Sequence, residues 1–486
     1  MVSEIIVKAR AAQKLWENLP YSEKAKRLKE AARSLGQSVD EIARVIHEDN
    51  GKLTIDALAT EVLPAILAMN FYIKNGRKFV RSRTIGGRSL LMFNKTSRMT
   101  FKPYGVVGII SPWNYPFAIP FSEVVMALLA GNAVILKTAS VTPHVGRAIA
   151  RIFEEAGLPD GLFAYVEMPG KDAGPAFIAG GIDKLFFTGS TATGRELMAL
   201  AAPRLLPLVL ELGGADAAIV RADADLDRAA AGVIWAGFSN AGQSCGGIQR
   251  VLVHRAVFAP FLEKLSRLTE NLREGVDMGP MATLKQKQSV QRQIDACLAK
   301  GAKIAVKSQS SESGNFLSAI ILTDVTDDMP VMREEIFGPV IAVMPVNDDE
   351  EALRIANSSA YGLTGSVWSR NRRAACALAA RVNAGAMMVN DHLMSHGLAE
   401  TPWGGFGDSG IGRTHGEAGF REMLKAQVVV DDFLPAVKRN LWWQPYSEKV
   451  YAGIHSIVEL LAGRSFLSKM KALPGVLRIF FRYWEK

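Results

Sequence analysis

The stretch that decides the fold runs from Tyr104 to Lys137 and reads YGVVGIISPWNYPFAIPFSEVVMALLAGNAVILK. It opens with the apolar run Val106–Ser111, which is typical of a strand buried on both faces. A proline-rich turn follows, and then an apolar helix over Glu123–Ala130 and a second strand over Ala133–Lys137. This alternation of strand and helix predicts a doubly wound, mostly parallel α/β sheet.

The same alternation continues along the chain in both directions. Residues 1–50 read as charged amphipathic helix, and Ser89–Lys102 reads as a strand. Further strands are predicted at Phe163–Val166 and Lys184–Phe187, and a second alternating series begins near Ala217. We therefore expect two α/β units that meet just after Gly213-Gly214.

Composition and charge narrow the class of protein. A chain of 486 residues with 49% apolar and 22% charged residues suits large globular cores, which excludes disorder and fibrous repeats. Three cysteines make no disulfide framework, and the N-terminal segment lacks an apolar signal-peptide core, so we expect a cytoplasmic protein. The uncharged stretch Pro103–Ser122 is interrupted by prolines, so it is not expected to form a membrane-spanning helix. The uncharged stretch Val124–Leu136 is too short to span a membrane.

The basic excess lies at one end of the chain. The formal charge is +9, and residues 436–486 carry nine Lys and Arg against three Glu. The remainder is nearly neutral and shows no basic stripe or nucleic-acid motif, so we expect no nucleic-acid partner.

Three segments could carry chemistry. Cys245 lies among small residues in NAGQSCGG, which would let a substrate reach its sulfur. Glu211 ends an apolar strand before two glycines, where poor solvation would suit a general base. Asn114, held in the turn SPWNYP, could donate to an oxyanion. Each has a structural alternative, since an isolated cysteine is commonly a buried small hydrophobe and the glutamate could be a strand-end cap.

A fourth segment, FTGSTATG over 187–194, is a weaker signal. Gly189 follows a strand and Gly194 opens a helix, an arrangement that suits a phosphate at a helix N-terminus. The spacing differs from the usual dinucleotide fingerprint, so the segment alone decides nothing.

Together these segments resemble the aldehyde dehydrogenase superfamily over about residues 1 to 434. The resemblance is carried by PWNYP, LELGG, the GQSC segment 34 residues after it, EIFGPV at 335–340, and PWGGF at 402–406 running on to DSG. The order and spacing of five separate motifs favour the catalytic interpretation of Cys245 and Glu211 over the structural one.

The resemblance implies a role for each matched residue. Cys245 would attack an aldehyde, Asn114 would hold the oxyanion, and Glu211 would activate the water that releases the acid. The cofactor is implied to be NAD or NADP, and the residues that match its contacts are Trp113, Lys137, Ser140, Gly189, Ser190, Glu335 and Phe337. Ser140 stands where many NAD-preferring members carry an acidic residue, so we expect use of both cofactors. The presence of Glu211 favours hydrolysis over transfer to coenzyme A.

The resemblance also implies domains and partners. Residues 1–85 and 104–212 would form the cofactor-binding domain, 213–412 the catalytic domain, and 86–103 with 413–434 an oligomerisation arm. We expect a homodimer or homotetramer. The substrate tunnel would be lined by Tyr115, Ile119, Trp235 and Phe238, which favours aliphatic or aromatic aldehydes of medium or long chain over semialdehydes of diacids. His392 and His396 lie in a loop without a carboxylate at metal-site spacing, so we expect no metal.

Residues 435–486 form a basic amphipathic tail beyond the family core. Val450, Ile454, Ile457, Val458 and Leu461 fall on one helical face, and the last segment places aromatic residues between arginines. The tail resembles in kind that of fatty aldehyde dehydrogenases. Two interpretations stay open, an anchor at a membrane surface and a segment that packs on its own or a partner subunit.

Two rival functions also stay open. A cysteine hydrolase would need the thiol, an oxyanion donor and a water base, but it would leave the residues that match the cofactor contacts without a role. A catalytically idle binding protein of the same fold would not need both Cys245 and Glu211.

Overall fold

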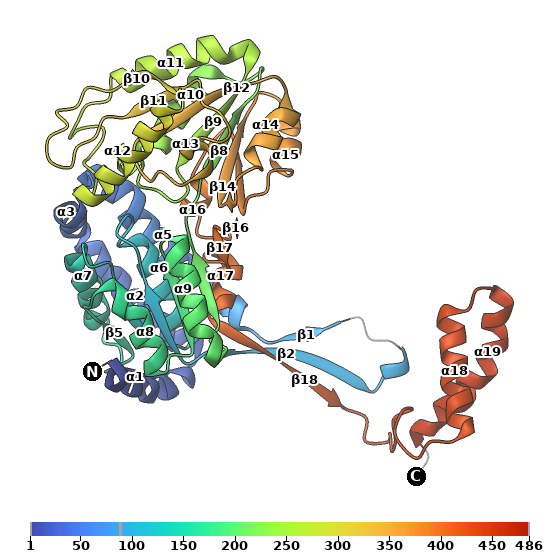
Figure 1. The fold of residues 1–486 in the computed structure, drawn as a ribbon. Coiled ribbons are helices and arrows are strands. Elements are labelled where there is room, and N and C mark those ends of the chain that lie inside the picture. The colour runs from blue at the N-terminus through green and yellow to red at the C-terminus, as the bar shows by residue number, and fades with distance from the viewer. Residues whose placement is uncertain (1, 87–89, 485–486) are drawn as a thin grey trace. The chain divides into compact units, whose positions relative to one another are not determined.

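The computed structural model describes residues 2–86 and 90–484 and divides the chain into two compact units (Figure 1). The larger unit comprises residues 1–80 and 102–425, and the smaller comprises 81–101 and 426–486. Met1, Gly87, Arg88, Ser89, Glu485 and Lys486, which include part of the predicted arm and the end of the tail, lie outside the described residues.

The first sheet of the larger unit has six strands in the order β17-β7-β6-β3-β4-β5, parallel except for β17. Their bounds are β3 (Val106–Ile110), β4 (Ala133–Lys137), β5 (Phe163–Tyr165), β6 (Lys184–Thr188), β7 (Leu208–Glu211) and β17 (Gly410–Ile411). The connecting helices are α6 (Ala118–Ala130), α7 (Pro143–Glu155), α8 (Gly170–Gly180) and α9 (Thr191–Ala201), with the turn η3 (Ala202–Arg204).

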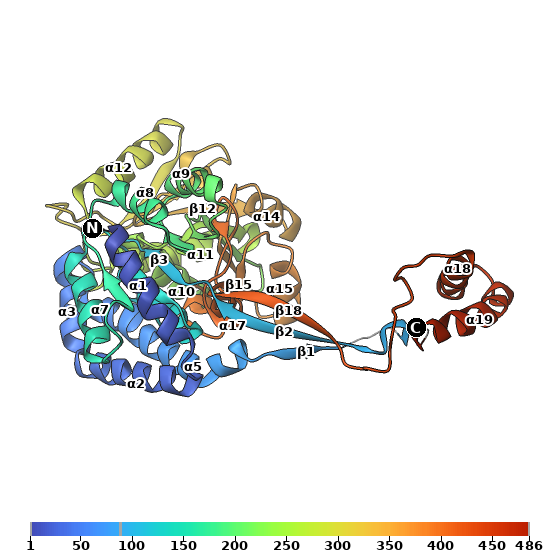
Figure 2. The same cartoon turned by 90° about the horizontal axis from the view of Figure 1, so that it is seen from below.

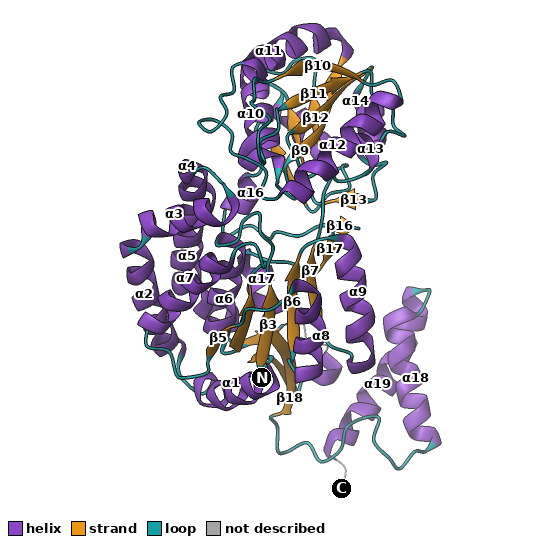
Figure 3. Cartoon of the chain, turned by 60° about the vertical axis from the view of Figure 1, so that its left-hand side comes forward, coloured by secondary structure: helices purple, strands orange, loops and turns teal. Residues whose placement is uncertain are grey.

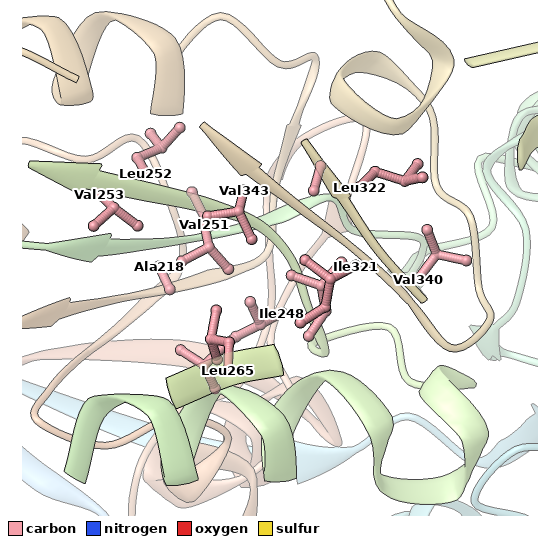
Figure 4. Packing of buried hydrophobic residues seen from close by; sticks show 14 of the residues in the cluster. Ala218, Ile248, Val251, Leu252, Val253, Leu265, Ile321, Leu322, Val340 and Val343 are labelled. Atoms are coloured by element: carbon pink, nitrogen blue, oxygen red, sulfur yellow. The ribbon is translucent and has the colours of Figure 1, made fainter. Parts of the chain in front are cut away.

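The second sheet has seven strands in the order β10-β11-β12-β9-β8-β14-β15, parallel except for β10. Their bounds are β8 (Asp216–Val220), β9 (Ile248–His254), β10 (Lys303–Lys307), β11 (Ile320–Thr323), β12 (Val340–Val346), β14 (Thr364–Trp368) and β15 (Ala386–Val389). Apolar side chains from its central strands, including Val251, Ile321 and Val343, pack with Leu265 of the helix beside them (Figure 4).

Helices cover this second sheet, as the cartoon coloured by secondary structure shows (Figure 3). They are α10 (Leu226–Phe238), α11 (Phe258–Glu270), α12 (Leu284–Ala299), α13 (Pro330–Arg333), α14 (Asp349–Ala356) and α15 (Arg372–Ala379), with the turns η4 (Ser239–Gly242) and η5 (Arg255–Val257). Short elements are α16 (Met394–Gly397), which contacts β15 of the second sheet, α17 (Gly416–Glu422), which contacts α5 and α6, and the pair β13 (Tyr361–Gly362) and β16 (Phe406–Gly407). The predicted fold class, with two doubly wound parallel sheets, is confirmed.

The N-terminal segment forms α1 (Val2–Glu17), α2 (Tyr21–Gln37) and α3 (Val39–Asn50), and a longer helix then runs from residue 54 to 80. That helix consists of α4 (Thr54–Ala57), a π turn η1 (Leu58–Val62) and α5 (Leu63–Val80). By length and composition it is apolar enough to cross a membrane, but α5 packs on α2 and α6 and buries residues such as Tyr72 and Phe79. One face of this helix therefore packs in the core of the larger unit.

Two predicted boundaries differ from the structure. The helix expected at Glu123 begins at Ala118, because Pro120 falls in its first turn, where a missing N–H costs nothing. The strand expected over Ser89–Lys102 begins at Lys95 as β2 (Lys95–Pro103), and Leu90–Met92 is a short turn, η2. Leu91 and Phe93 pack there against a cluster of tail residues that includes Leu441 and Tyr483.

The smaller unit contains a three-stranded sheet and a helical hairpin (Figure 2). The sheet order is β1-β2-β18, from β1 (Arg83–Ile85), β2 and β18 (Leu424–Asp432). The hairpin consists of α18 (Glu448–Ala462) and α19 (Phe466–Phe480), followed by the turn η6 (Phe481–Trp484). Arg83–Ile85 thus pairs with the predicted arm, while α17 lies in the larger unit.

Candidate active site

Cys245 lies where two cavities of the larger unit meet. One cavity, here called the polar cavity for the Ser190, Gln286 and Glu335 side chains in its wall, has a volume of about 290 Å³ and is lined by both polar and apolar residues. The other, here called the apolar cavity, has a volume of about 200 Å³ and a largely apolar wall. Cys245 belongs to both walls. A sulfur in this place can contact one ligand on each side.

The loop that carries Cys245 is held in an uncommon backbone conformation. Asn240 and Ala241 have φ values of 53° and 54°, which few residues other than glycine adopt. At Gly242, where φ is 68°, an added Cβ would lie 2.1 Å from the backbone oxygen of Gly338. The Gln243 side chain secures the loop, donating to Asn240 O at 2.9 Å and accepting from Ala282 N at 2.8 Å. Such strain persists where the surroundings over-determine it, as at many functional sites.

Asn114 lies beside this loop, in the turn between β3 and α6. Its Nδ2 donates to Gln243 O at 3.2 Å, and Asn240 Nδ2 donates to Asn114 O at 3.0 Å. An amide NH2 group has two donors, so one N–H of Asn114 is available to a ligand oxygen in the polar cavity. The predicted oxyanion donor and the predicted nucleophile are therefore brought together.

Glu211 ends β7 and is buried, and neither of its carboxylate oxygens has a hydrogen-bond partner among the described residues. Burial raises its pKa well above the ordinary value, and the nearby Glu123 carboxyl raises it further. Glu123, on α6, itself has its pKa raised to about 8 by burial. Glu211 does not line either cavity, but it lies close enough to Cys245 to raise the pKa of that thiol.

Two glycines after Glu211 make room for Glu335. A Cβ on Gly213 would lie 2.5 Å from Glu335 Oε2, and Gly214 N donates to Glu335 Oε1 at 3.1 Å. Burial raises the pKa of Glu335 to about 7. The glycine pair in the LELGG segment therefore lets a carboxylate from the second half of the chain reach the polar cavity.

The polar cavity also brings together the residues predicted to meet a dinucleotide. Trp113, Gly189, Ser190, Glu335 and Phe337 all line it. The rings of Trp113 and Phe337 meet edge to face with centroids 5.3 Å apart. The exposed Ser190 caps α9, whose N-terminus opens toward the cavity beside Gly189. A helix N-terminus, a carboxylate and an aromatic ring fit the pyrophosphate, ribose and nicotinamide of NAD(P).

Two of the residues predicted to bind the cofactor do not line the polar cavity, and three residues that line it were not predicted from the sequence. Lys137 is buried at the end of β4, where burial lowers its pKa, and Ser140 is exposed beyond it, so neither lines the cavity. The structure adds three polar residues of α12 to the wall, Gln286, Ser289 and Gln293. These three residues are spaced three and four apart in the sequence, so they lie on one face of the helix, and this spacing could have predicted a shared polar face.

The apolar cavity is lined by two of the four residues predicted to line the substrate tunnel. Tyr115 and Trp235 line it, whereas Ile119 and Phe238 are buried in the core and do not. Their helices turn them inward, which spacing along the chain could not reveal. Residues of helices α4 to α5 line the opposite side, namely Ala59, Thr60, Leu63, Pro64 and Leu67. Among the residues that the structure describes, neither Lys nor Arg lines this cavity.

Of the two predicted loop histidines, His392 is buried and His396 is half-buried, and the segment 394–397 is a helical turn rather than the expected loop. His392 Nε2 lies 2.9 Å from Gly246 O, and His396 lines the apolar cavity. Burial lowers the pKa of each to about 4, so both are neutral near pH 7.

Comparison with known proteins gives a consistent result. The model of the aldehyde dehydrogenase family matches residues 1–429. The chain is 36% identical over 485 residues to 4,4'-diapolycopene aldehyde oxidase of Methylomonas, covering 99% of this chain and 91% of that protein. It is 37% identical over 437 residues to a protein of Mycolicibacterium smegmatis provisionally named succinate-semialdehyde dehydrogenase [NADP(+)], covering 88% and 84%.

A solved structure with the same fold is that of betaine aldehyde dehydrogenase from Staphylococcus aureus in complex with NAD+. It superposes with a TM-score of 0.84 at 27% identity, covering 91% of each chain.

The protonation of Cys245 yields a first prediction. Burial, followed by the carboxylates of Glu335, Asp216 and Glu211, raises the pKa of this thiol, so it is neutral at pH 7 in the free protein. We expect its alkylation by iodoacetamide to rise about tenfold per pH unit well beyond the ordinary thiol pKa of about 8.5. Mass spectrometry of the Cys245 peptide measures the rate, with exposed Cys376 as internal control. A plateau at Cys245 below about pH 8 would contradict this expectation.

Proposed function

The chain belongs to the aldehyde dehydrogenase family, and on that premise we propose that Cys245 is the nucleophile that converts an apolar aldehyde to its carboxylic acid. The family oxidises aldehydes with NAD(P). The observation that carries the assignment is that Cys245 lines both cavities, one with polar and apolar residues in its wall and one that is largely apolar. A dinucleotide on the polar side and an aldehyde on the apolar side would then meet at one sulfur.

In this proposal the side chains divide the chemistry among them. The Cys245 thiol loses its proton to solvent, and Sγ bonds to the carbonyl carbon while the carbonyl oxygen becomes an oxyanion. Asn114 Nδ2 and the backbone N–H of Cys245 hold that oxyanion. NAD(P)+ supplies the acceptor for the hydride that leaves the carbon, which leaves a thioester on Sγ. Glu211 takes a proton from water, the water oxygen adds to the thioester carbon, and the acid departs as the Cys245 thiol is restored.

A cysteine hydrolase is the rival function. The same thiol and oxyanion donor would serve it, but it has no use for an aromatic ring and a carboxylate in the polar cavity. Phe337 and Glu335 both line that cavity, which favours the dinucleotide-dependent reaction.

The assignment predicts the behaviour of two variants. Cys245→Ala should lower aldehyde oxidation at least about a thousandfold with either NAD+ or NADP+, because the covalent path is lost. Glu211→Gln should keep a first-turnover burst of reduced cofactor but slow steady turnover by about 10²–10⁴.

Absorbance at 340 nm reads both rates, with Cys376→Ala as the control of unchanged activity. We expect kcat/KM for NAD+ and NADP+ to differ by less than about a hundredfold, since a serine accepts either ribose form. A fully active Cys245→Ala protein rejects the assignment, and dinucleotide-independent ester hydrolysis without aldehyde oxidation favours the hydrolase.

The substrate is proposed to be a medium- or long-chain apolar aldehyde. The apolar cavity offers no cation for a second carboxylate, and its mouth is ringed by the half-exposed side chains of Leu63, Leu67, Trp235 and Met394. An apolar ring at the mouth lets a chain longer than the cavity extend outward without burying polar groups. The relative that acts on 4,4'-diapolycopene aldehyde aligns over 99% of this chain, including the tail, which supports the same class of substrate.

An aldehyde panel tests this substrate class. From butanal to decanal we expect kcat/KM to rise about fourfold per methylene while the cavity fills, from about 0.8 kcal/mol per buried CH2. The kcat/KM for succinic semialdehyde should be lower than that for butanal, because the second carboxylate would be buried without a partner. Trp235→Ala should flatten the length dependence while Trp442→Ala, in the smaller unit, should not. A preference for succinic semialdehyde over butanal contradicts the proposal.

We further propose that the protein is cytoplasmic and docks on an anionic membrane through residues 436–486. The α18–α19 hairpin packs through Val450, Gly453 and Ile457 on one helix and Ala472 and Ile479 on the other. An added Cβ on Gly453 would touch Ile479 and one on Gly475 would touch Ser456, so the helices run antiparallel at close range.

One face of the hairpin is apolar and exposed. In each helix the residue after a contact residue lies about 100° further round. Because the helices are antiparallel, this step leads to the same side of the hairpin in both. On that side stand Tyr451, Ile454, Val458 and Leu461 of α18, and Phe466, Met470, Leu473, Leu477 and Phe481 of α19 and η6.

Phe466 is 78% exposed and Leu461 is 68% exposed. Lys449, Lys471 and Arg478 precede contact residues and lie on the other side. An apolar face with a basic excess suits anionic lipid better than a nearly neutral protein surface.

Vesicle sedimentation tests the docking. The parent protein should bind vesicles of phosphatidylcholine with about 30% phosphatidylserine and release in high salt. The variant Leu461→Ser/Phe466→Ser/Leu477→Ser should lose binding. The matched control Val7→Ser/Leu15→Ser/Leu205→Ser, at exposed apolar positions of the larger unit, should keep it. A parent protein that does not bind the vesicles contradicts a membrane role. The same holds if the Leu461→Ser/Phe466→Ser/Leu477→Ser variant loses self-association while neither protein binds vesicles.

The oligomer is proposed to be a homodimer or homotetramer. β18 is the edge strand of its sheet, and Val428, Val429 and Val430 are each about half exposed. An exposed apolar edge strand is suited to pairing with a second chain.

A further inference from the structure

We propose that a group of buried and half-buried polar side chains from residues 50–61 positions Asn114 for the reaction. The group, here called the 50–61 clamp, consists of Asn50, Lys52, Asp56 and Glu61. The inference rests on the proposed function, because Asn114 is given there the role of holding the oxyanion. It concerns four residues that do not themselves line either cavity, so they act through the loops that they hold.

The centre of the clamp is an ion pair without contact to solvent. Lys52 Nζ lies 2.5 Å from Glu61 Oε1, and both side chains are fully buried. Lys52 follows Gly51, which ends α3 with φ of 78°, and Glu61 stands in the π turn of the long helix. A buried ion pair adds little stability over apolar side chains of similar volume, and π turns occur frequently at functional sites. The pair therefore calls for a role beyond folding.

Glu61 secures the chain on the C-terminal side of Asn114. Its second oxygen, Oε2, accepts from Phe117 N at 2.7 Å and from Ala118 N at 3.2 Å. These are the first N–H groups of α6, whose N-cap residue makes no side-chain capping bond. A carboxylate from a distant helix thus replaces the missing cap, where the helix dipole favours an anion.

Asn50 and Lys52 secure the N-terminal side. Asn50 Nδ2 donates to Trp113 O at 2.9 Å, and its Oδ1 accepts from Lys52 N at 3.0 Å. The Lys52 ammonium lies 4.0 Å from the centroid of the Tyr115 ring, within cation–π range. The backbone is therefore bonded to the clamp immediately before Asn114 and again three residues after it.

The same clamp reaches the loop of Cys245. The Asp56 carboxyl lies close enough to the backbone N–H of Asn240 for that N–H to lower its pKa, and the Asn240 side chain donates to Asn114 O. The loops of the predicted oxyanion donor and of the predicted nucleophile thus both lie beside residues 50–61. Since oxyanion stabilisation requires donors within about 3 Å of the oxygen, loosening the clamp should cost catalysis before it costs substrate binding.

The decisive variant replaces the pair by apolar groups of similar volume, Lys52→Met/Glu61→Leu. We expect kcat to fall ten- to a hundredfold, with the aldehyde KM, the Kd for NAD+ and the rate of Cys245 alkylation each within about twofold of the parent. Lys52→Met/Glu61→Gln restores an acceptor for Phe117 N and Ala118 N, and should recover part of the rate. The matched control is Lys184→Met/Glu422→Gln, an ion pair with a buried lysine that touches no predicted site residue, which should keep kcat within twofold.

A double-mutant cycle separates positioning from general damage. In an Asn114→Ala background the Lys52→Met/Glu61→Leu change should lower kcat less than twofold, because the group that it positions is already absent. A full additional loss in that background, or no loss in the parent, overturns the proposal. If the double variant does not fold, Asn50→Ala takes its place in the cycle, with the same expectation. A parent protein that reduces no NAD(P)+ with any aldehyde would instead overturn the proposed function.

Discussion

No side chain fits where β7 leaves the first sheet. A Cβ on Gly214 would lie 2.2 Å from the backbone oxygen of Cys245, and one on Gly213 would collide with the Glu335 carboxylate. This close packing brings a strand end of one sheet, the nucleophile loop and a residue of the second sheet to one place. The polar cavity, its glutamate and the thiol all depend on it, because any larger residue at 213 or 214 would separate the loops.

The ionisable groups of the site are largely enclosed by protein, and their pKa values follow from that. Burial comes first among the causes that raise the pKa of Cys245, Glu211 and Glu335. Neutral groups are less costly to bury than charged ones, so the resting site holds its protons. A bound cofactor with a positively charged nicotinamide ring would favour the thiolate, which couples nucleophile activation to cofactor binding.

Two parts of the chain expose large apolar side chains. The mouth of the substrate cavity and one face of the α18–α19 hairpin expose more large apolar side chains than a protein in water alone requires. Both are consistent with the proposed apolar aldehyde substrate and the proposed membrane docking. The long helix at 54–80 contributes to two features. Its first half supplies Asp56 and Glu61 to the 50–61 clamp, and its Leu63 and Leu67 side chains line the apolar cavity.

The sequence by itself determined the alternating α/β order, the two sheets, and the motifs around Asn114, Glu211 and Cys245, because hydrophobic periodicity and glycine spacing are local properties. It also indicated the amphipathic tail. Only the tertiary structure decided that Trp235 lines a cavity while Ile119 and Phe238 are buried, that α12 supplies polar residues to the wall, and that Lys52 and Glu61 meet beneath the Asn114 loop. These facts depend on how helices are rotated and on contacts between distant segments, which no local pattern encodes.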